Sequence, residues 1–322
     1  MLHSIGNPVL WGVFAAMVVS AFYLDLRGLL RDRDAVMPLR RALIRSLYWV
    51  MLALSFLLFL WGYLYLTVDP AFAGEKSAEF LTAWLLEKSL SFDNLFVILM
   101  IFRVLQIPEM YQRRVLFWGV LGAAVLRFIV IFGGIWLVDI FHWLLYVFGI
   151  FIFYSGAQML FQSEKSEKDP SEGALFQWLS RHLRVTPRLH GEHFFVREQG
   201  RLWATPLFMV LVMVELSDLI FATDSIPAVF AITLDPFIAF TSNMLAVLGL
   251  RAMYFILVHA EREIEGLHIG IAIVLMLTGL KMLSARWIHF TTFWMLVLVV
   301  GVLGVTGFLG WLKKKMKRMQ VK

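Results

Sequence analysis

The sequence contains no cysteine, and only 16% of its 322 residues are charged. Without cysteine the chain can form no disulfide, no thiolate metal site and no thiol nucleophile. Soluble domains are typically about half apolar and about a quarter charged, whereas this chain is 60% hydrophobic with a mean hydropathy of +0.78. The composition therefore indicates a membrane protein in which one compact bundle takes up the chain, with no separate large soluble domain.

Apolar runs of about 18 residues or more recur along the whole chain, and each can cross a hydrocarbon core about 30 Å thick. Backbone groups in lipid need partners within their own segment, so we expect every span to be an α-helix. The expected fold is all-α, a polytopic membrane helix bundle of about nine transmembrane helices. The expected spans are 8–27, 43–66, 80–103, 114–138, 141–161, 205–231, 236–258, 267–284 and 289–312.

Lysine and arginine are divided unevenly between the two sides of this expected bundle. Twenty-three lie on one side, and only Lys76 and Arg286 lie on the other. Because cytoplasmic loops are enriched in Lys and Arg, we expect the N-terminus outside and the C-terminus in the cytoplasm. The net charge of +6 then predicts contact with anionic lipid and no nucleic-acid partner. The basic side comprises the loops 27–45, 103–114, 162–204 and 259–266 and the C-terminal tail.

The segments 79–161 and 205–284 have similar sequences. Aligning Asp93-Asn94 with Asp224-Ser225 places Glu87 opposite Asp218. Each segment holds three spans, an odd number, so the two copies enter the membrane from opposite sides. Such inverted three-helix repeats are typical of secondary transporters, whose substrate site lies at the repeat interface. Further matches follow in the same order: Leu126-Arg127 with Leu250-Arg251, and Ser155–Leu160 with Thr278–Leu283.

The chain is thus expected to have five parts. The segment 162–204 is a cytoplasmic loop that ends in EHFFVREQGRLWATP, which is expected to form a short hairpin against the membrane face. The other parts are two peripheral N-terminal helices in 1–78, the first repeat in 79–161, the second repeat in 205–284, and a last helix with a basic tail in 285–322.

Nine charged residues lie inside the expected spans at least three residues from either end, and they are the most informative feature of the sequence. A charged side chain at a helix centre costs about 2.5–3.5 kcal/mol on insertion scales, so five acids cost on the order of 10 kcal/mol before compensation. The acids are Glu87, Asp93, Glu215, Asp218 and Asp224, and the bases are Lys88, Arg127, Arg251 and Lys281.

Two interpretations of these charges compete. One is internal ion pairing, in which Arg127 and Arg251 each clamp a carboxylate. The other is a site for a hard divalent cation, because the two motifs supply only oxygen ligands, of the kind that suit manganese, calcium or magnesium. The second interpretation explains why the acids cluster on two repeat-related helices. The candidate metal ligands are Glu87, Asp93, Asn94, Glu215, Asp218, Asp224 and Ser225, with Lys88, Arg127, Arg251 and Lys281 as supporting ion pairs.

Helix geometry limits how one cation could reach these residues. Glu215 and Asp218 are three residues apart and share a helix face. Asp218 and Asp224 are six apart, which turns their side chains about 120° from each other. One ion therefore reaches them all only if the helices are locally unwound or the site is shared between helices. Pro227, just after Asp224, is a candidate for such unwinding.

At EKSLSFDN (87–94) and at the long motif that begins with ELSDLIFATDSIPAVF (215–230), the sequence resembles the TerC family, and within it the Alx-type bacterial inner-membrane proteins. The resemblance extends over nearly the whole chain, including GEHFFVREQG in the loop. It implies an inner-membrane location and an association with manganese efflux, with alkaline or metal stress and with tellurite resistance. It also implies that the functional acids are those of the two motifs.

The leading hypothesis is a secondary transporter that exports Mn²⁺ from the cytoplasm, with Mn²⁺ as its substrate, no catalytic cofactor and a proton as the candidate coupling ion. A membrane scaffold for a metal, tellurite or pH stress-response complex is the alternative, and a carrier for another solute is a third. Homo-oligomers and stress-response protein partners are left open. We expect no enzymatic activity, because the sequence has no nucleophile elbow, no HExxH and no phosphate loop.

Overall fold

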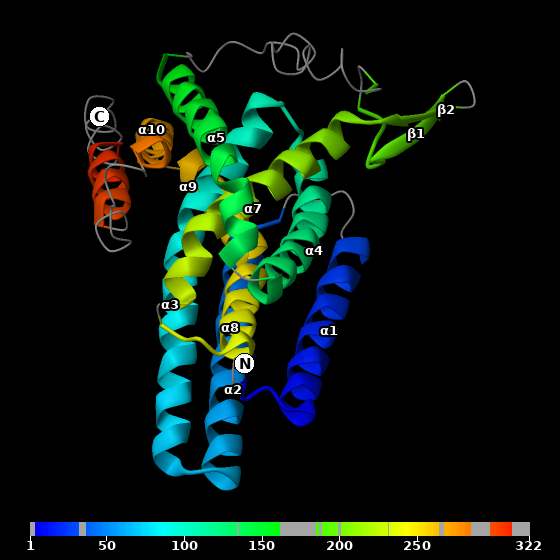
Figure 1. Cartoon of the computed structure of the whole chain (residues 1–322). Coiled ribbons are helices and arrows are strands. Elements are labelled where there is room, and N and C mark those ends of the chain that lie inside the picture. The colour runs from blue at the N-terminus through cyan, green and yellow to red at the C-terminus, as the bar shows by residue number, and fades with distance from the viewer. Residues whose placement is uncertain are drawn as a thin grey trace, which may run out of the picture.

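The computed structural model describes residues 4–31, 37–133, 135–161, 185–186, 189–198, 201–230, 232–263, 267–284 and 297–310. The described chain is a bundle of helices with one small β-hairpin at one end (Figure 1). The first three helices are α1 (Pro8–Arg31), α2 (Leu39–Thr67) and α3 (Pro70–Val104). They are followed by α4 (Glu109–Gly133), α5 (Ile135–Phe161), α7 (Pro206–Phe230), α8 (Pro236–Leu248), α9 (Leu250–Glu263) and α10 (Leu267–Ser284).

The expected all-α, polytopic membrane fold is confirmed. Within the described ranges, six stretches are long and apolar enough to cross a membrane. Two shorter apolar helices, Gly149–Leu160 and Val297–Gly310, lie in the expected fifth and last spans. The count of nine spans stays a prediction. The six stretches are Pro8–Arg27, Leu39–Thr67, Glu109–Gly133, Pro206–Phe230, Pro236–Glu261 and Leu267–Ser284.

Helix α3 begins earlier than the sequence pattern predicts. The expected span starts at residue 80, whereas the helix starts at Pro70. The Asp69 side chain accepts hydrogen bonds from the backbone N–H groups of Ala71 and Phe72 at 3.0 and 3.1 Å, and Pro70 follows it at the first helical position, where no N–H donor is needed. The polar first turns therefore extend the helix beyond the apolar run.

The expected single helix over 236–258 is instead two helices that meet at Gly249. A Cβ atom at Gly249 would lie 2.6 Å from Nζ of Lys88, whose ammonium group donates to the carbonyl oxygen of Ala246 at 3.2 Å. The helix break thus lies beside the half-buried ammonium group of Lys88 from α3. Helix α7, in contrast, continues through Pro227, so the unwinding expected there is not seen.

The helices that carry the two motifs lie at the centre of the bundle. Helix α3 packs against α7 and α8, α4 packs against α7, and α5 packs against α10. Every residue of α8 from Phe237 to Leu248 is buried. Helix α2 lies at the outside, where large apolar side chains such as Leu58 are exposed. This arrangement places apolar side chains toward lipid and the charged motifs in the interior.

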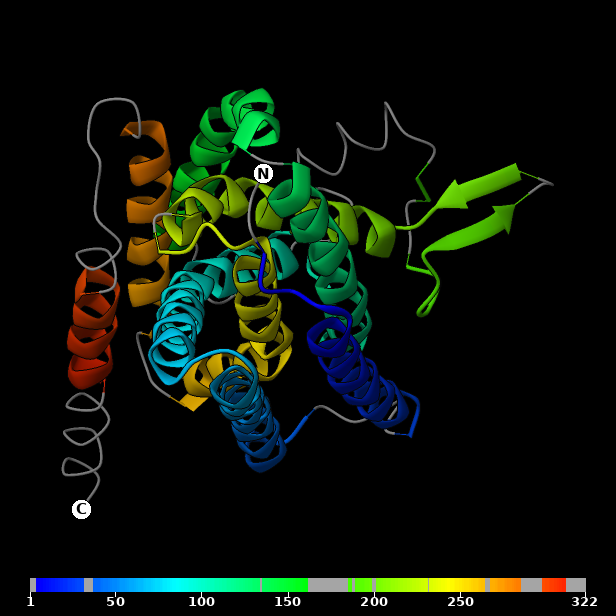
Figure 2. The ribbon, with the colours of Figure 1, turned by 60° about the horizontal axis from the view of Figure 1, so that its bottom comes forward.

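The hairpin expected at the end of the 162–204 loop is confirmed. Strands β1 (Phe195–Glu198) and β2 (Arg201–Ala204) pair antiparallel, with Phe195 opposite Ala204. The hairpin projects sideways from the bundle, on the side away from helix Val297–Gly310 (Figure 2). Arg114 on α4 anchors the preceding loop by an ion pair with Glu192 at 2.8 Å. Most of 162–204, all of 285–296 and the basic tail 311–322 lie outside the described residues.

Candidate functional site

Three carboxylates of the two motifs are buried in the core. Glu87 and Asp93 on α3 are 1% and 8% exposed, and Asp218 on α7 is 7% exposed. Because α3 packs directly against α7, the two motifs face each other although more than 120 residues separate them in the sequence. The structure thus brings acids from both sequence-related segments into one interior region.

Arg127 on α4 lies between the acids of the two motifs and binds both. Its Nη2 and Nε atoms donate to Oδ1 and Oδ2 of Asp218 at 2.7 and 3.0 Å, which is a bidentate pair. Its Nη1 atom forms an ion pair with Glu87 and donates to Oδ1 of Asn243 on α8 at 2.5 Å. A fully buried guanidinium group therefore ties together three helices around it.

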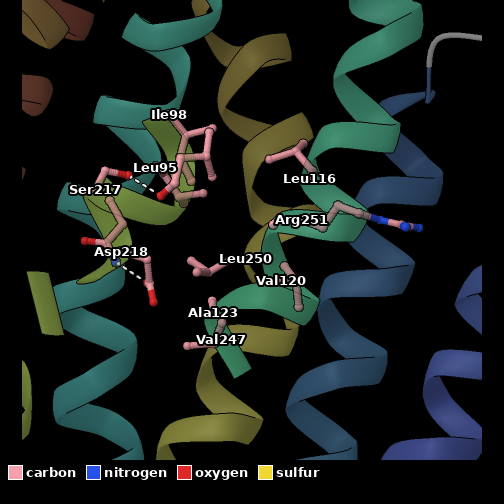
Figure 3. A pocket seen from close by; sticks show the side chains of 13 residues that line it. Leu95, Ile98, Leu116, Val120, Ala123, Ser217, Asp218, Val247, Leu250 and Arg251 are labelled. Carbon is pink, nitrogen blue, oxygen red and sulfur yellow. Dashed lines mark hydrogen bonds between the residues drawn. The ribbon is translucent and has the colours of Figure 1, made fainter. Parts of the chain in front are cut away.

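A small cavity adjoins this ion-pair network. Its volume is about 30 Å³, and one water molecule needs about 10–15 Å³. Asp218, Ser217 and Asn94 supply polar groups to its wall, and the remainder is mostly aliphatic (Figure 3). The Asn94 amide donates to Oδ1 of Asp218 at 3.4 Å. The cavity thus offers room for a small polar guest beside a carboxylate.

Glu215 lies one helical turn before Asp218, on the side of α7 that faces α4. Its carboxylate packs against Gly122 and is close to Gly119, where no side chain stands in the way. Its Oε2 atom is buried without a hydrogen-bond partner among the described residues. Buried acceptors without a donor are costly, so this carboxylate is a position where a cation would be stabilised.

The bases other than Arg127 have partners outside the two acidic motifs, where their contacts are described. Lys88 donates to the carbonyl oxygen of Ala246. Arg251 on α9 donates to Asp25 on α1 at 2.6 Å. Lys281 lies in the last turn of α10. Arg127 therefore binds a carboxylate of each motif, whereas the described partners of Lys88 and Arg251 lie outside the motifs.

Ser225 and Asp224, the last two predicted ligands, lie further along α7. The Oγ atom of Ser225 is buried and has no described partner. The side chain of Asp224 lies outside the described part of the structure. Among the described residues, no three carboxylate or histidine side chains are grouped closely enough to hold a metal ion. Arg127 occupies the position where carboxylates from both segments would otherwise meet.

Two residues that bind the predicted arginines were not themselves predicted from the sequence. Asn243 is 0% exposed and stands alone as an amide within the apolar run PFIAFTSNMLAVL, which is a signal that could have identified it. Asp25 lies at the end of the first apolar run, where a charged residue is expected to lie at the membrane interface. Only the three-dimensional packing shows that Asp25 binds Arg251.

Fold and site together define a polytopic integral membrane protein with an interior network of ion-paired carboxylates. The model of the integral membrane protein TerC family matches residues 72–318. The chain therefore belongs to the TerC family. No solved structure matches the chain.

Curated relatives cover nearly the same length. The chain is 47% identical over 288 residues to a protein of Escherichia coli (strain K12) named "Putative membrane-bound redox modulator Alx", with 89% of each chain covered. A protein of Photorhabdus laumondii with the same name is also 47% identical, over 89% of this chain and 90% of the relative. An uncharacterized membrane protein of Rickettsia bellii is 35% identical, over 90% of this chain and 93% of the relative.

Proposed function

We propose that this protein is a secondary transporter that exports a divalent cation, Mn²⁺, from the cytoplasm across the inner membrane. The observation that carries the proposal is the interior network in which Arg127 joins a carboxylate of each motif, Glu87 on α3 and Asp218 on α7. A membrane interior is a costly place for such groups, and intramembrane ionisable residues usually mark ion pathways. The network lies beside a cavity of about 30 Å³.

Unsatisfied buried oxygens support a hard cation as the substrate. Three acceptors around the network lack a hydrogen-bond partner among the described residues: Oε2 of Glu87, Oδ1 of Asn94 and Oε2 of Glu215. Carboxylate and amide oxygens are the ligands that manganese, calcium and magnesium prefer. The choice of manganese among these ions rests on the family resemblance.

The contribution of both segments to one network supports transport over a purely structural role. In transporters built from inverted repeats, the substrate site lies between the repeats near the middle of the membrane. A purely structural ion pair would have no need of the unpartnered carboxylate of Glu215 or of the adjoining cavity. We therefore interpret the acids as a substrate site, which Arg127 occupies when no cation is bound.

The relatives' name, a membrane-bound redox modulator, limits how a redox role could operate here. The chain has no cysteine, so thiol–disulfide chemistry within the chain is excluded. Any effect on cellular redox state would have to come through what the protein moves or binds. Removal of a redox-active metal ion from the cytoplasm is such a route, and it agrees with the transport proposal.

The test is Mn²⁺ flux in proteoliposomes that contain the purified protein and a metal-quenched dye. We expect the wild type to move Mn²⁺, and Asp218→Asn and Glu215→Gln to lower the flux at least tenfold. Glu75→Gln is the matched control, because Glu75 is a carboxylate near the start of α3 whose side chain is 65% exposed. Wild-type flux no greater than that of protein-free vesicles would overturn the proposal.

Export direction needs a second measurement. Inside-out membrane vesicles present the cytoplasmic face to the medium, so an exporter accumulates external Mn²⁺ in them. Raising the pH gradient across the same vesicles tests coupling to protons. Equal accumulation in vesicles of both orientations would contradict net export while leaving transport itself intact.

A further inference from the structure

Two arginines that match each other in the two segments have different partners. Arg127 on α4 binds Glu87 and Asp218. Arg251 on α9 donates through Nη2 to Asp25 on α1. Among the described contacts, only one of these two matched arginines therefore binds the matched carboxylates.

The packing of α5 against α10 shows that the two segments are related closely enough for this difference to be informative. A Cβ atom at Gly156 would lie 2.9 Å from the carbonyl oxygen of Ala272 and 3.0 Å from the backbone nitrogen of Met276. At the matched Gly279, a Cβ atom would lie 2.8 Å from the carbonyl oxygen of Gly149 and 2.7 Å from the backbone nitrogen of Phe153.

These two sets of contacts correspond to each other atom by atom. In the register that matches Gly156 with Gly279, Gly149 matches Ala272 and Phe153 matches Met276. Exchanging the two segments therefore converts one set of contacts into the other, as an approximate two-fold axis between α5 and α10 would do. The different partners of Arg127 and Arg251 break this symmetry.

Arg251 is close to the site although it does not bind there. It lines the same cavity as Asp218 and Ser217, but its guanidinium group extends away from Asp218 (Figure 3). Its Nη2 atom is held by Asp25, while its Nη1 atom is buried without a described partner.

We propose that Arg251 is a positioning residue that alternates with Arg127 as the counter-ion of the buried carboxylates. This inference rests on the proposed transport function. Asp25 holds Arg251 away from the cavity while Arg127 occupies Glu87 and Asp218. A divalent cation displaces Arg127 from these carboxylates. After the cation has left on the other side, Arg251 releases Asp25 and binds Asp218 and Glu87, the pair that exchange of the two segments assigns to it, and Arg127 remains displaced.

Electrostatics explains why the two arginines alternate. Two guanidinium groups and a divalent cation cannot share two carboxylates, because like charges repel strongly where the effective dielectric constant is low. Leaving the carboxylates with no cation is equally costly within the membrane. One bound cation at a time, from either arginine or from the metal, leaves the carboxylate pair with at most one uncompensated charge in every state.

The absence of cysteine makes the chain a ready background for a site-specific reporter. We choose Val120→Cys, because Val120 on α4 is an apolar residue of the cavity wall. A membrane-impermeant maleimide added to either side of sealed vesicles reports from which side the cavity is reached. Asp25→Asn in this background removes the charge that holds Arg251, so the ratio of labelling from the two sides should change at least threefold.

The controls separate release of Arg251 from general damage. Asp25→Glu keeps the charge and should restore the original labelling ratio. Arg45→Gln removes the other base near Asp25, whose Nη1 lies 3.7 Å from Oδ1, and should leave the ratio unchanged. Asp25→Asn combined with Arg251→Gln should label like Arg251→Gln alone, because Asp25 then has no arginine to release.

Arg251→Gln by itself provides a second test if Asp25→Asn does not assemble. We expect Mn²⁺ exchange to fall at least tenfold and labelling to become restricted to one side. Arg251→Lys should retain both the Mn²⁺ exchange and the labelling from the two sides. Equal labelling ratios in Asp25→Asn and in its parent, with Mn²⁺ flux intact, would overturn the alternation and leave the proposed function standing. Absence of Mn²⁺ flux in the wild type would instead overturn the transport function.

Discussion

Gly122 on α4 lies directly against the carboxylate of Glu215 on α7. A Cβ atom at Gly122 would lie 2.6 Å from Oε2 of Glu215 and still closer to Oε1. No side chain larger than hydrogen fits there without displacing a carboxylate that has a buried, unpartnered oxygen. The glycine therefore provides the space that lets Glu215 lie inside the bundle beside Asp218.

Gly122→Ala should displace Glu215 and impair the site. Overpacking of a well-packed interior costs about 1–3 kcal/mol, so we expect a lower melting temperature in detergent together with at least a tenfold loss of Mn²⁺ flux. Gly62→Ala on α2 is the control, because nothing lies within 4 Å of its added Cβ atom, and alanine is the better helix former. Normal flux in Gly122→Ala would show that the position of Glu215 is unimportant.

Glu215→Gln should separate stability from function. The substitution replaces a half-buried carboxylate, one of whose oxygens is buried without a partner, with a neutral amide of nearly the same shape, and a buried charge costs more than a buried amide. We therefore expect a higher melting temperature than that of the wild type without metal. The rise in melting temperature on adding Mn²⁺, which follows from binding to the folded state, should become smaller. A lower metal-free melting temperature would mean that Glu215 has a stabilising partner.

The apolar runs and the charges within them predicted the core of this fold, because the membrane constrains both. Apolar runs had to be helices, and the acids of the two motifs had to be inside, since they lie in the middle of those runs. The segment match placed Glu87 opposite Asp218, and both bind the same arginine. What the pattern could not supply was the choice of arginine, because Arg127 and Arg251 are equivalent in sequence.

Local chemistry decided the points that periodicity missed. The start of α3 at Pro70 depends on the cap at Asp69, which lies outside any apolar run. The helix break at Gly249 lies beside the Lys88 ammonium group of another helix, which donates to the carbonyl oxygen of Ala246. The pairing of Asp25 with Arg251 joins residues 226 positions apart. The first of these features is a local capping contact and the other two are tertiary contacts, and the apolar pattern of a single helix contains neither kind.

Arg127→Gln should be strongly destabilising, because it leaves Glu87 and Asp218 as buried carboxylates without their shared cation. Breaking a buried pair by removing one partner costs about 3–5 kcal/mol, so the melting temperature and the folded yield should both fall. Adding Glu87→Gln and Asp218→Asn to the variant removes the uncompensated charges. That triple variant should regain most of the lost melting temperature while remaining unable to transport Mn²⁺.

Failure of the triple variant to recover would mean that Arg127 stabilises the bundle by packing rather than by charge. Arg127→Lys distinguishes these cases further. A lysine keeps the charge but cannot form the two parallel hydrogen bonds to Asp218. We therefore expect an intermediate melting temperature for Arg127→Lys, and a value equal to that of Arg127→Gln would contradict the electrostatic explanation.

Gly156→Ala and Gly279→Ala test the matched contacts between α5 and α10. An added Cβ atom meets backbone atoms of the other helix at 2.9 Å for Gly156 and 2.7 Å for Gly279, and backbone cannot move aside as a flexible side chain can. We expect each variant to lose stability by about 1–3 kcal/mol, and by similar amounts because the contacts correspond. Gly301→Ala, with nothing within 4 Å of its added Cβ, should melt like the wild type.

A large loss of stability in one glycine variant and none in the other would show that the two segments are not packed symmetrically. The argument for exchange between Arg127 and Arg251 would then lose its geometric basis.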